Sequence, residues 1–288
     1  MGERRLKTVF FGTPGFTAPV LKALLNNGGY DIVAVFTGRG PLAKLAEEHG
    51  IKVYQPVSLK KDDLVFEEFK NLKPDICVVA AYGKIFSKRF LDIPRYGFVN
   101  VHPSLLPEYR GPSPIQTALL NGDKETGAAI MLIDEKIDHG PLLAEEKYDI
   151  GVGKDLVEIS EELFGLGAKL LIKTLPGYIG GDIKPREQDH SKATFTKIFT
   201  RGDGRINWND PAQEIYNRIR ALNPEPGTWT LLRSSGASEE QTKIINIKSA
   251  EIVNGKLQIK TIQMEGKKEM PFEEFLRGHP DFDISQLK

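Results

Sequence analysis

The chain has 288 residues, of which 40% are hydrophobic and 27% charged, the composition of a soluble globular protein with room for two ordinary domains. Its 39 basic and 39 acidic residues cancel, so no overall positive field points to a nucleic-acid partner, and any RNA contact must depend on a local patch. The N-terminus lacks the apolar segment of a signal peptide, and no stretch approaches the roughly 20 apolar residues that span a bilayer, so we expect a cytoplasmic protein without a membrane partner.

The chain contains a single cysteine, Cys77, which excludes an intramolecular disulfide. It lies within the apolar run Ile76–Ala81, where a small hydrophobic side chain fits and no neighbour that would activate a thiolate is evident. We therefore interpret Cys77 as a core residue.

From Leu6 to Ala81, short apolar runs alternate with segments that carry apolar residues at helical spacing. The runs expected to form strands are Thr8–Phe11, Asp31–Phe36, Ile51–Tyr54 and Ile76–Ala81. The segments expected to form helices are Ala18–Leu25, Leu42–His49 and Leu64–Leu72. This alternation predicts a Rossmann-like, mostly parallel α/β sheet with helices on both faces and right-handed crossovers.

A fifth apolar run, Phe98–His102, ends in polar residues before a proline-rich loop. Its last side chains are therefore expected at the carboxyl edge of the sheet, where open α/β sheets bind ligands. Further strands are expected at Ala128–Ile133 and Leu142–Tyr148. An amphipathic helix is expected from Asp155 to Leu175, where Pro176-Gly177 would end it.

The stretch after this helix is rich in glycine, proline and charge, which predicts a linker. Downstream, a helix from Pro211 to Leu222 precedes short β-rich runs, which predict a small second domain resembling a β-barrel of the OB type. Those runs are Thr228–Arg233, Lys243–Lys248 and Lys256–Gln263. We thus expect a first domain over residues 1–180, a linker over 181–195 and a C-terminal domain over 196–288.

Two hydrogen-bonding side chains in Asn100-Val101-His102 share one face of the fifth strand, about 7 Å apart along it. An asparagine can donate to a developing oxyanion, and a histidine can transfer a proton near neutral pH. Such a pair is also common as a satisfied strand end, and the pattern alone leaves both readings open. The loop Pro103–Pro114 that follows is stiffened by prolines, which suits either a rigid surface connection or fixed backbone donors.

A carboxylate, Asp138, lies in the polar loop Asp134–Gly140 between two expected strands. This loop can return to the same sheet edge, where a carboxylate beside His102 would orient the imidazole and stabilise its charge. From the residues alone, the alternative interpretation is that Asp138 is a turn residue before Gly140.

Taken together, Asn100-x-His102, Ser104-Leu105-Leu106-Pro107 and Asp138 resemble the signature of the 10-formyltetrahydrofolate formyltransferases. The resemblance implies that an acceptor amine attacks the formyl group of 10-formyltetrahydrofolate, with tetrahydrofolate as the leaving group. It assigns Asn100 to the formyl oxyanion, His102 to proton transfer and Asp138 to holding His102. It requires neither a metal nor a covalent enzyme nucleophile.

The same resemblance implies a folate site whose pterin lies between two segments at the sheet edge. Its residues would be Tyr82, Gly83, Lys84, Ile85 and Phe86, then Ser104, Leu105, Leu106 and Pro107, and finally Ile133, Asp134 and Ile137. Backbone donors with apolar walls suit a flat heterocycle. From the residues alone, Phe86 would be a core side chain and Lys84 a solvated charge.

Other motifs resemble the branch of this family that formylates initiator methionyl-tRNA for translation initiation. They are Phe11–Phe16, Pro114–Gln116, Asn121–Gly127, Gly204–Trp208, Ile219–Pro224 and Gly266–Met270. In this interpretation a monomer binds tRNA through a mildly basic patch of its C-terminal domain, whereas the charges alone would suit a solvated face. The residues expected to contact tRNA are Arg39, Lys197, Arg201 and Arg205.

The sequence departs from that branch after the second strand, where the tRNA-acting members carry a longer basic loop. Here Phe36-Thr37 runs directly into Gly38-Arg39-Gly40, so Arg39 is what remains of the loop's basic character. A rival hypothesis is formyl transfer to a nucleotide-sugar amine, which would predict a different C-terminal module. A second rival is a non-catalytic RNA-binding protein on the same scaffold, against which the intact catalytic set argues.

Overall fold

The computed structural model describes residues 4–59, 62–232, 243–280, 282 and 287. The chain forms two compact units. The first comprises Met1–Pro114, Glu125–Asp149 and Ile159–Thr196, and the second comprises Ile115–Lys124, Ile150–Glu158 and Lys197–Lys288. Residues 181–195, which the sequence predicts to be a linker, thus group with the first unit. Two internal segments group with the C-terminal part of the chain.

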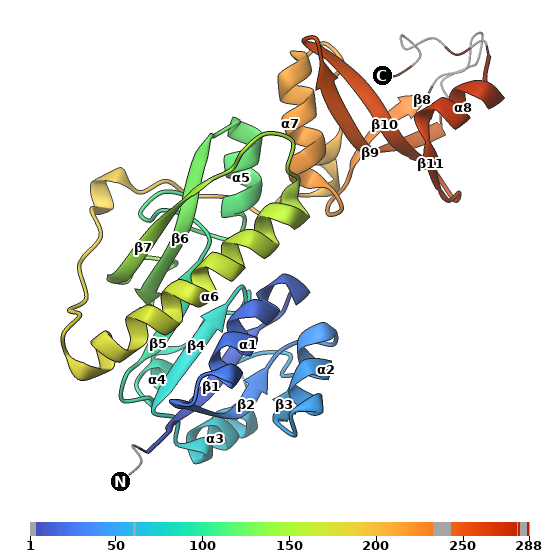
Figure 1. Cartoon of the computed structure of the whole chain (residues 1–288). Helices are drawn as coiled ribbons and strands as arrows, with labels where there is room; N and C mark the ends of the chain where they lie inside the picture. The colour runs from blue at the N-terminus through green and yellow to red at the C-terminus, as the bar shows by residue number, and fades with distance from the viewer. Residues whose placement is uncertain (1–3, 60–61, 233–242, 281, 283–286, 288) are drawn as a thin grey trace. The chain divides into compact units, whose positions relative to one another are not determined.

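A seven-stranded sheet in the order β3-β2-β1-β4-β5-β6-β7 forms the centre of the first unit (Figure 1). Its strands are β1 Leu6–Gly12, β2 Tyr30–Phe36, β3 Lys52–Tyr54, β4 Ile76–Ala80, β5 Phe98–His102, β6 Glu125–Leu132 and β7 Leu142–Asp149. The first five strands in this spatial order, from β3 across to β5, are parallel. Strands β6 and β7 extend the sheet with antiparallel pairing. The predicted, mostly parallel sheet is confirmed. Its strand order changes direction between β1 and β4, and such a switch point is where open α/β sheets bind ligands.

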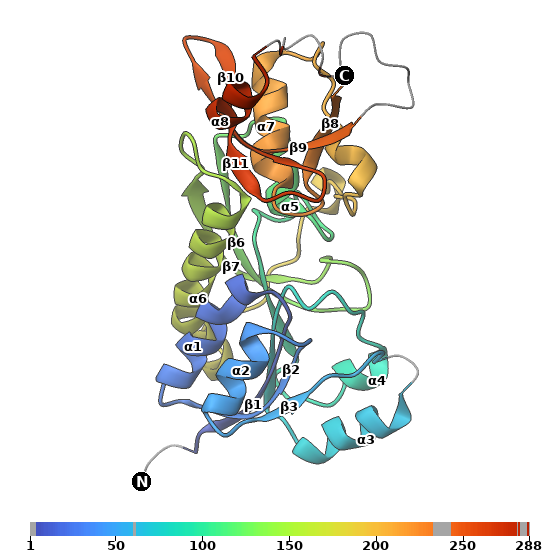
Figure 2. The ribbon, with the colours of Figure 1, turned by 90° about the vertical axis from the view of Figure 1, so that its right-hand side faces the viewer.

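Helices cover both faces of this sheet (Figures 1 and 2). They are α1 Ala18–Asn26, α2 Pro41–Glu48, α3 Asp63–Leu72, α4 Lys88–Leu91 and α6 Leu156–Gly180. The helices α3 and α4 lie over the face that carries Phe11, because their Phe69 and Phe90 belong to the same core cluster. The opposite face is covered by α1, α2 and α6, and there Phe16 meets Phe164 of α6 with 5.2 Å between ring centroids.

The core under α3 and α4 is aromatic. The ring of Phe11 lies 5.0 Å from that of Phe86 and 5.6 Å from that of Phe98, measured between centroids. Each aromatic pair of this kind contributes about 0.5–1.5 kcal/mol beyond its buried area. Because side chains alternate along β5, Phe98, Asn100 and His102 share this face. The polar end of β5 therefore continues directly from the aromatic core.

The longest helix, α6, differs from the sequence prediction at its C-terminal end. It continues through Pro176 to Gly180 instead of ending before the proline. A proline inside a helix removes one N–H donor and disturbs one earlier carbonyl, and here packing holds the turn beyond it, since Tyr178 Oη donates to the backbone oxygen of Tyr96 at 3.3 Å. Within the described ranges, no helix is both long and apolar enough to cross a membrane.

The second unit contains an antiparallel sheet in the order β11-β10-β9-β8. Its strands are β8 Thr228–Leu232, β9 Lys243–Val253, β10 Lys256–Met264 and β11 Glu269–Pro271, and its helices are α5 Pro114–Asn121, α7 Ala212–Leu222 and α8 Phe272–Gly278. Ile215 and Ile219 of α7 pack with Ile245 and Ile247 of β9 in its core. The predicted β-rich domain is confirmed as a four-stranded antiparallel sheet of described residues. Arg233, at the end of one predicted strand, lies outside them.

Candidate active site

Asn100 and His102 end β5 on the same face of the sheet. Both are buried, with 8% and 4% of their surface exposed, and β4 and β6 flank them on either side. No described residue hydrogen-bonds the side chain of Asn100, so its amide is available to a ligand. Because a buried donor interacts strongly with a developing charge, Asn100 is suited to bind an oxyanion.

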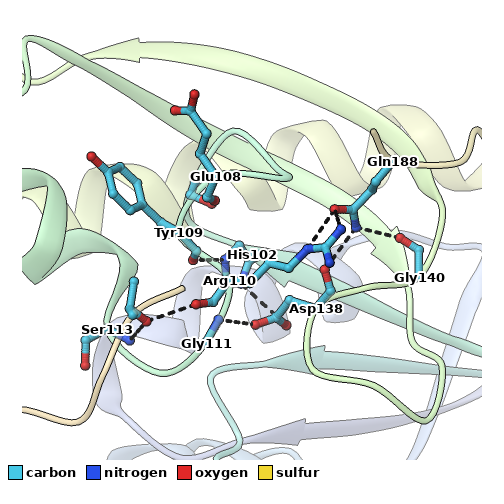
Figure 3. A network of polar contacts seen from close by, with 11 residues as sticks. His102, Glu108, Tyr109, Arg110, Gly111, Ser113, Asp138, Gly140 and Gln188 are labelled. Atoms are coloured by element: carbon cyan, nitrogen blue, oxygen red, sulfur yellow. Dashed lines mark hydrogen bonds and ion pairs between the residues drawn. The ribbon is translucent and has the colours of Figure 1, made fainter. Parts of the chain in front are cut away.

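The imidazole of His102 lies between two partners (Figure 3). Its Nε2 is 3.0 Å from the carbonyl oxygen of Tyr109, and its Nδ1 is 3.7 Å from Oδ1 of Asp138. A carbonyl oxygen only accepts, so Nε2 carries the donated proton and a neutral ring presents an unprotonated Nδ1 to the carboxylate. Once Nδ1 gains a proton, the imidazolium faces Asp138 at ion-pair distance. The pair is therefore arranged for proton uptake at Nδ1.

Asp138 is held through the backbone around it. Its Oδ2 accepts a hydrogen bond from the N–H of Gly111 at 2.7 Å, and its own φ is 46°, in the left-handed region. For a residue other than glycine this conformation costs of order 1–3 kcal/mol, so the surrounding contacts must maintain it. Asp138 is thus both a turn residue and the carboxylate beside His102, and the two sequence hypotheses describe the same structure.

The proline-rich loop after β5 supplies these backbone partners. The hydroxyl of Ser104 donates to the carbonyl oxygen of Glu108 at 2.7 Å and closes the loop on itself. Tyr109 has a φ of 57° and Gly111 a φ of 108°. A Cβ at position 111 would lie 2.9 Å from Oγ1 of Thr196, so glycine is required there both by conformation and by space.

A later segment, residues 188–196, hydrogen-bonds to this loop, and we name it the 188–196 clamp. The N–H of Tyr109 donates to Oγ1 of Thr194 at 2.8 Å, and the N–H of Arg110 donates to the carbonyl oxygen of Thr194 at 2.9 Å. In return, the N–H of Thr196 donates to the carbonyl oxygen of Arg110 at 2.8 Å. These bonds form a short strip of parallel pairing that holds the loop to the 188–196 clamp.

Two buried polar residues of this region, Arg110 and Gln188, are missing from the sequence prediction. They are 3% and 5% exposed and hydrogen-bond to each other across 78 positions of the chain. Arginine and glutamine are mostly exposed in proteins, and nothing in local periodicity marks either of these as buried. The one sequence signal near these residues was the proline-rich loop. It predicts a rigid backbone around Arg110 but does not indicate which residue Arg110 binds.

The predicted folate-binding segments lie on the same face of β5 as the polar strand end. Phe86 packs on Phe98 with 4.6 Å between centroids, and Ile133 packs against the same core cluster. The neighbouring Ile85 and Ile137 are 71% and 57% exposed. Exposed apolar side chains next to a packed aromatic core are the kind of wall that a flat heterocycle needs, so the residues present fit a pterin.

The remaining predicted folate residues make varied contacts. Tyr82, Ser104 and Leu106 are buried, whereas Leu105 and Pro107 are half-buried. Asp134 accepts a hydrogen bond from Nδ1 of His139 at 2.7 Å. Burial lowers the pKa of the Lys84 ammonium, which donates to the backbone oxygen of Pro56.

A cavity of about 440 Å³ lies at the carboxyl edge of β1 to β4, at the switch point of the sheet. It brings Arg39, predicted to contact tRNA, beside the predicted folate segment. Its lining residues are Thr13, Thr37, Gly38, Arg39, Gln55, Pro56, Tyr82, Gly83 and Lys84.

In the second unit, two of the predicted RNA contacts gather on one aromatic ring. The guanidinium carbons of Arg201 and Arg205 lie 5.4 and 5.7 Å from the ring centre of Trp229. Stacking of this kind orders the side chains while their charges stay in water. Lys197 instead pairs with the carboxylate of Asp203, so part of its charge is neutralised.

An amide donor, an imidazole and a fixed carboxylate at one sheet edge suit the transfer of a small acyl group. The chain belongs to the formyl transferase family, since residues 6–175 match the family model "Formyl transferase" and residues 199–280 match "Formyl transferase, C-terminal domain". The resemblance inferred from the sequence is confirmed.

Among curated relatives, the methionyl-tRNA formyltransferase of Roseiflexus sp. (strain RS-1) is 39% identical over 301 residues, which cover 95% of this chain and 92% of that protein. The methionyl-tRNA formyltransferase of Clostridium acetobutylicum is 38% identical, over 95% of this chain and 97% of its own.

Solved structures share the fold. The methionyl-tRNA formyltransferase from Clostridium thermocellum matches with a TM-score of 0.63 at 20% identity, over 90% of this chain and 99% of that one. HypX from Aquifex aeolicus, in complex with tetrahydrofolic acid, matches with a TM-score of 0.69 at 14% identity, over 95% of this chain and 47% of that one. At these identities the likeness concerns the fold alone.

Proposed function

We propose that this protein transfers the formyl group of 10-formyltetrahydrofolate to the amino group of initiator methionyl-tRNA, a step of translation initiation. The observation that carries the proposal is the site at the end of β5, where Asn100 has a free amide and Asp138 lies 3.7 Å from His102. Relatives with this activity in their name align over nearly the whole chain. We place the enzyme in the cytoplasm as a monomer.

Asn100 acts on the oxygen of the transferred group in this proposal. When bound, 10-formyltetrahydrofolate supplies the formyl carbon and a nitrogen leaving group. The buried amide of Asn100 donates a hydrogen bond to the carbonyl oxygen as it gains negative charge. A single fixed donor of this kind is worth about 2.7–4 kcal/mol of transition-state stabilisation.

His102 handles the proton that the attacking amine must lose. The unprotonated Nδ1 accepts this proton, and Asp138 stabilises the resulting imidazolium. The proton is then returned to the leaving nitrogen, so the ring ends the cycle neutral. Tyr109 keeps the ring in place throughout, because its carbonyl oxygen continues to accept from Nε2.

The folate and the tRNA would use different parts of the chain. Ile85 and Phe86, with Ile133 and Ile137, would hold the pterin by apolar contact. The arginine pair stacked on Trp229 would contact phosphates, and such contacts make binding depend on salt.

The test is transfer of labelled formyl from 10-formyltetrahydrofolate to methionine-charged initiator tRNA, beside charged elongator tRNA and a nucleotide-sugar amine. We expect product on the initiator tRNA, and a protein carrying Asn100→Ala serves as the matched negative control. Transfer to the sugar amine without transfer to tRNA would keep the chemistry and overturn the acceptor. Absence of transfer to all three acceptors would overturn the activity.

A further inference from the structure

The side chain of Gln188 joins the proline-rich loop to the loop that carries Asp138 (Figure 3). Its Oε1 accepts from Nε and Nη2 of Arg110 at 3.1 and 2.6 Å. Its Nε2 donates to the carbonyl oxygens of Asp138 and Gly140 at 3.0 and 2.7 Å. One amide thus uses both of its acceptor positions and both of its donor hydrogens.

We propose that Gln188 is a positioning residue for the formyl transfer, acting through Asp138 on His102, and this inference rests on the proposed function. Asp138 sits in a left-handed conformation with a φ of 46°, which its own backbone does not favour. Its carbonyl oxygen is bonded by Gln188 and its carboxylate by the N–H of Gly111. These two bonds fix both ends of the residue and thereby the distance from Oδ1 to Nδ1 of His102.

Arg110 connects the two loops through the same amide. The residues on either side of it contact the catalytic pair, since Tyr109 accepts from His102 and Gly111 donates to Asp138. Three consecutive positions therefore reach the pair, two through the backbone and Arg110 through Gln188. A displacement of the Gln188 amide would be transmitted to both partners of the proton-transfer pair.

The chemistry of the site requires an amide at position 188. Arg110 is 3% exposed and forms no ion pair with a carboxylate in the described part of the chain, so neutral acceptors satisfy it. These are Oε1 of Gln188 and Nδ1 of His190, the latter 2.9 Å from Nη2. A glutamate at 188 would still accept from Arg110, but it would place a second acceptor against two carbonyl oxygens.

The substitution Gln188→Glu separates positioning from packing because it keeps the shape of the side chain while it removes both donors and adds a carboxylate, whose charge Arg110 can pair with. We expect kcat to fall about tenfold or more, since small misplacements of a catalytic group have effects of this size. The KM values for folate and tRNA should stay within about twofold, because Gln188 is not placed against either substrate. The second variant, Arg110→Lys, keeps the cation but replaces the two-nitrogen fork that binds Gln188 with a single ammonium group, and a smaller loss of kcat is expected.

A second measurement is the titration of His102, followed by NMR in the protein without substrates. A purely structural role of Gln188 would leave this titration unchanged. His102 is identified among the five histidines by the loss of its signal in His102→Gln. We expect Gln188→Glu to shift this titration in the same direction as Asp138→Asn, which is opposite to the shift that the added negative charge alone would cause. His49 and His279, which lie away from Gln188 and its partners, should keep their titrations. The measurement does not depend on the acceptor, so it remains informative if the proposed tRNA activity fails.

A folded Gln188→Glu protein with wild-type kcat would overturn the proposal. A fall in kcat with an unchanged His102 titration would also overturn it, since the effect would then come from elsewhere. If Gln188→Glu does not fold, Arg110→Lys decides by the same two measurements.

Discussion

The N–H of Gly111 donates to Oδ2 of Asp138 at 2.7 Å, and this bond turns the other carboxylate oxygen toward His102. The donor belongs to a loop next to β5, and the acceptor belongs to a loop between β6 and β7. A backbone donor cannot be replaced by a rotamer change, so the orientation of the carboxylate is a property of the fold. The chemistry of the site therefore depends on main-chain geometry as much as on its polar side chains.

Replacement of Asp138 tests the carboxylate itself. We expect Asp138→Asn to lower kcat by about 10²-fold or more. The neutral amide cannot stabilise an imidazolium, so His102 loses the carboxylate that favours proton uptake. The variant keeps the size of the side chain, so circular dichroism should be unchanged. Asp31→Asn, on exposed β2 surface, is the matched control. Equal turnover of Asp138→Asn and wild type would remove Asp138 from the mechanism.

Replacement of Asn100 tests oxyanion stabilisation. Asn100→Asp is nearly isosteric but presents a second negative charge where an amide donor is required, and we expect kcat to fall about 10²- to 10³-fold with little change in KM. Single-turnover measurements with saturating folate and acceptor would isolate the chemical step. A raised KM with normal kcat would show instead that Asn100 only binds substrate.

The stacked arginines predict how binding responds to salt. Arg205→Gln should raise the KM for tRNA and reduce the slope of log affinity against log salt by about 1, because one phosphate contact is lost. The KM for folate should be unaffected. Lys22→Gln, on exposed α1, is a control that removes a positive charge elsewhere. An unchanged slope for Arg205→Gln would place the RNA contact away from Trp229.

Acid stability should depend in part on Asp203. The hydrogen bond from Lys197, together with those from Thr200, lowers the pKa of the Asp203 carboxyl to about 2. The folded-state value lies below the usual value of about 3.9, so Asp203 stabilises the fold above that pH, and its contribution disappears as the pH falls through about 2. Asp203→Asn should flatten this part of the curve of melting temperature against pH. A variant curve parallel to wild type between about pH 4 and pH 2 would contradict the assignment.

The single thiol should report unfolding. Cys77 is fully buried in β4, and burial raises its pKa well above the ordinary value. The thiolate is the nucleophile that attacks a thiol reagent, so native protein should react only as fast as it opens. Labelling rates measured across a urea series should follow the unfolding transition. Rapid labelling of the native protein would place Cys77 at the surface.

Sequence periodicity predicts the sheet because its strands are buried on both faces and read as apolar runs, as in β4 and β5. The predicted end of α6 was wrong. Pro176 is a local signal that breaks helices, and the sequence shows only this signal. The hydrogen bond of Tyr178 to Tyr96, which accompanies the added turn, is a tertiary contact between residues far apart in the chain. In the candidate site, Asn100 and His102 follow from strand alternation. The pairing of Asp138 needs the φ of a turn and a distant N–H, neither of which a single sequence displays.

The 188–196 clamp also sets where this protein can be divided or recombined. A fragment cut at Gly180 would retain all seven strands of the first sheet together with Asn100, His102 and Asp138, yet leave the N–H groups of Tyr109 and Arg110 without their acceptors in Thr194. A chimera that takes a C-terminal module from a relative would have to keep the native chain as far as Thr196. The last boundary between the two units along the chain is therefore the peptide bond before Lys197, well past the end of α6.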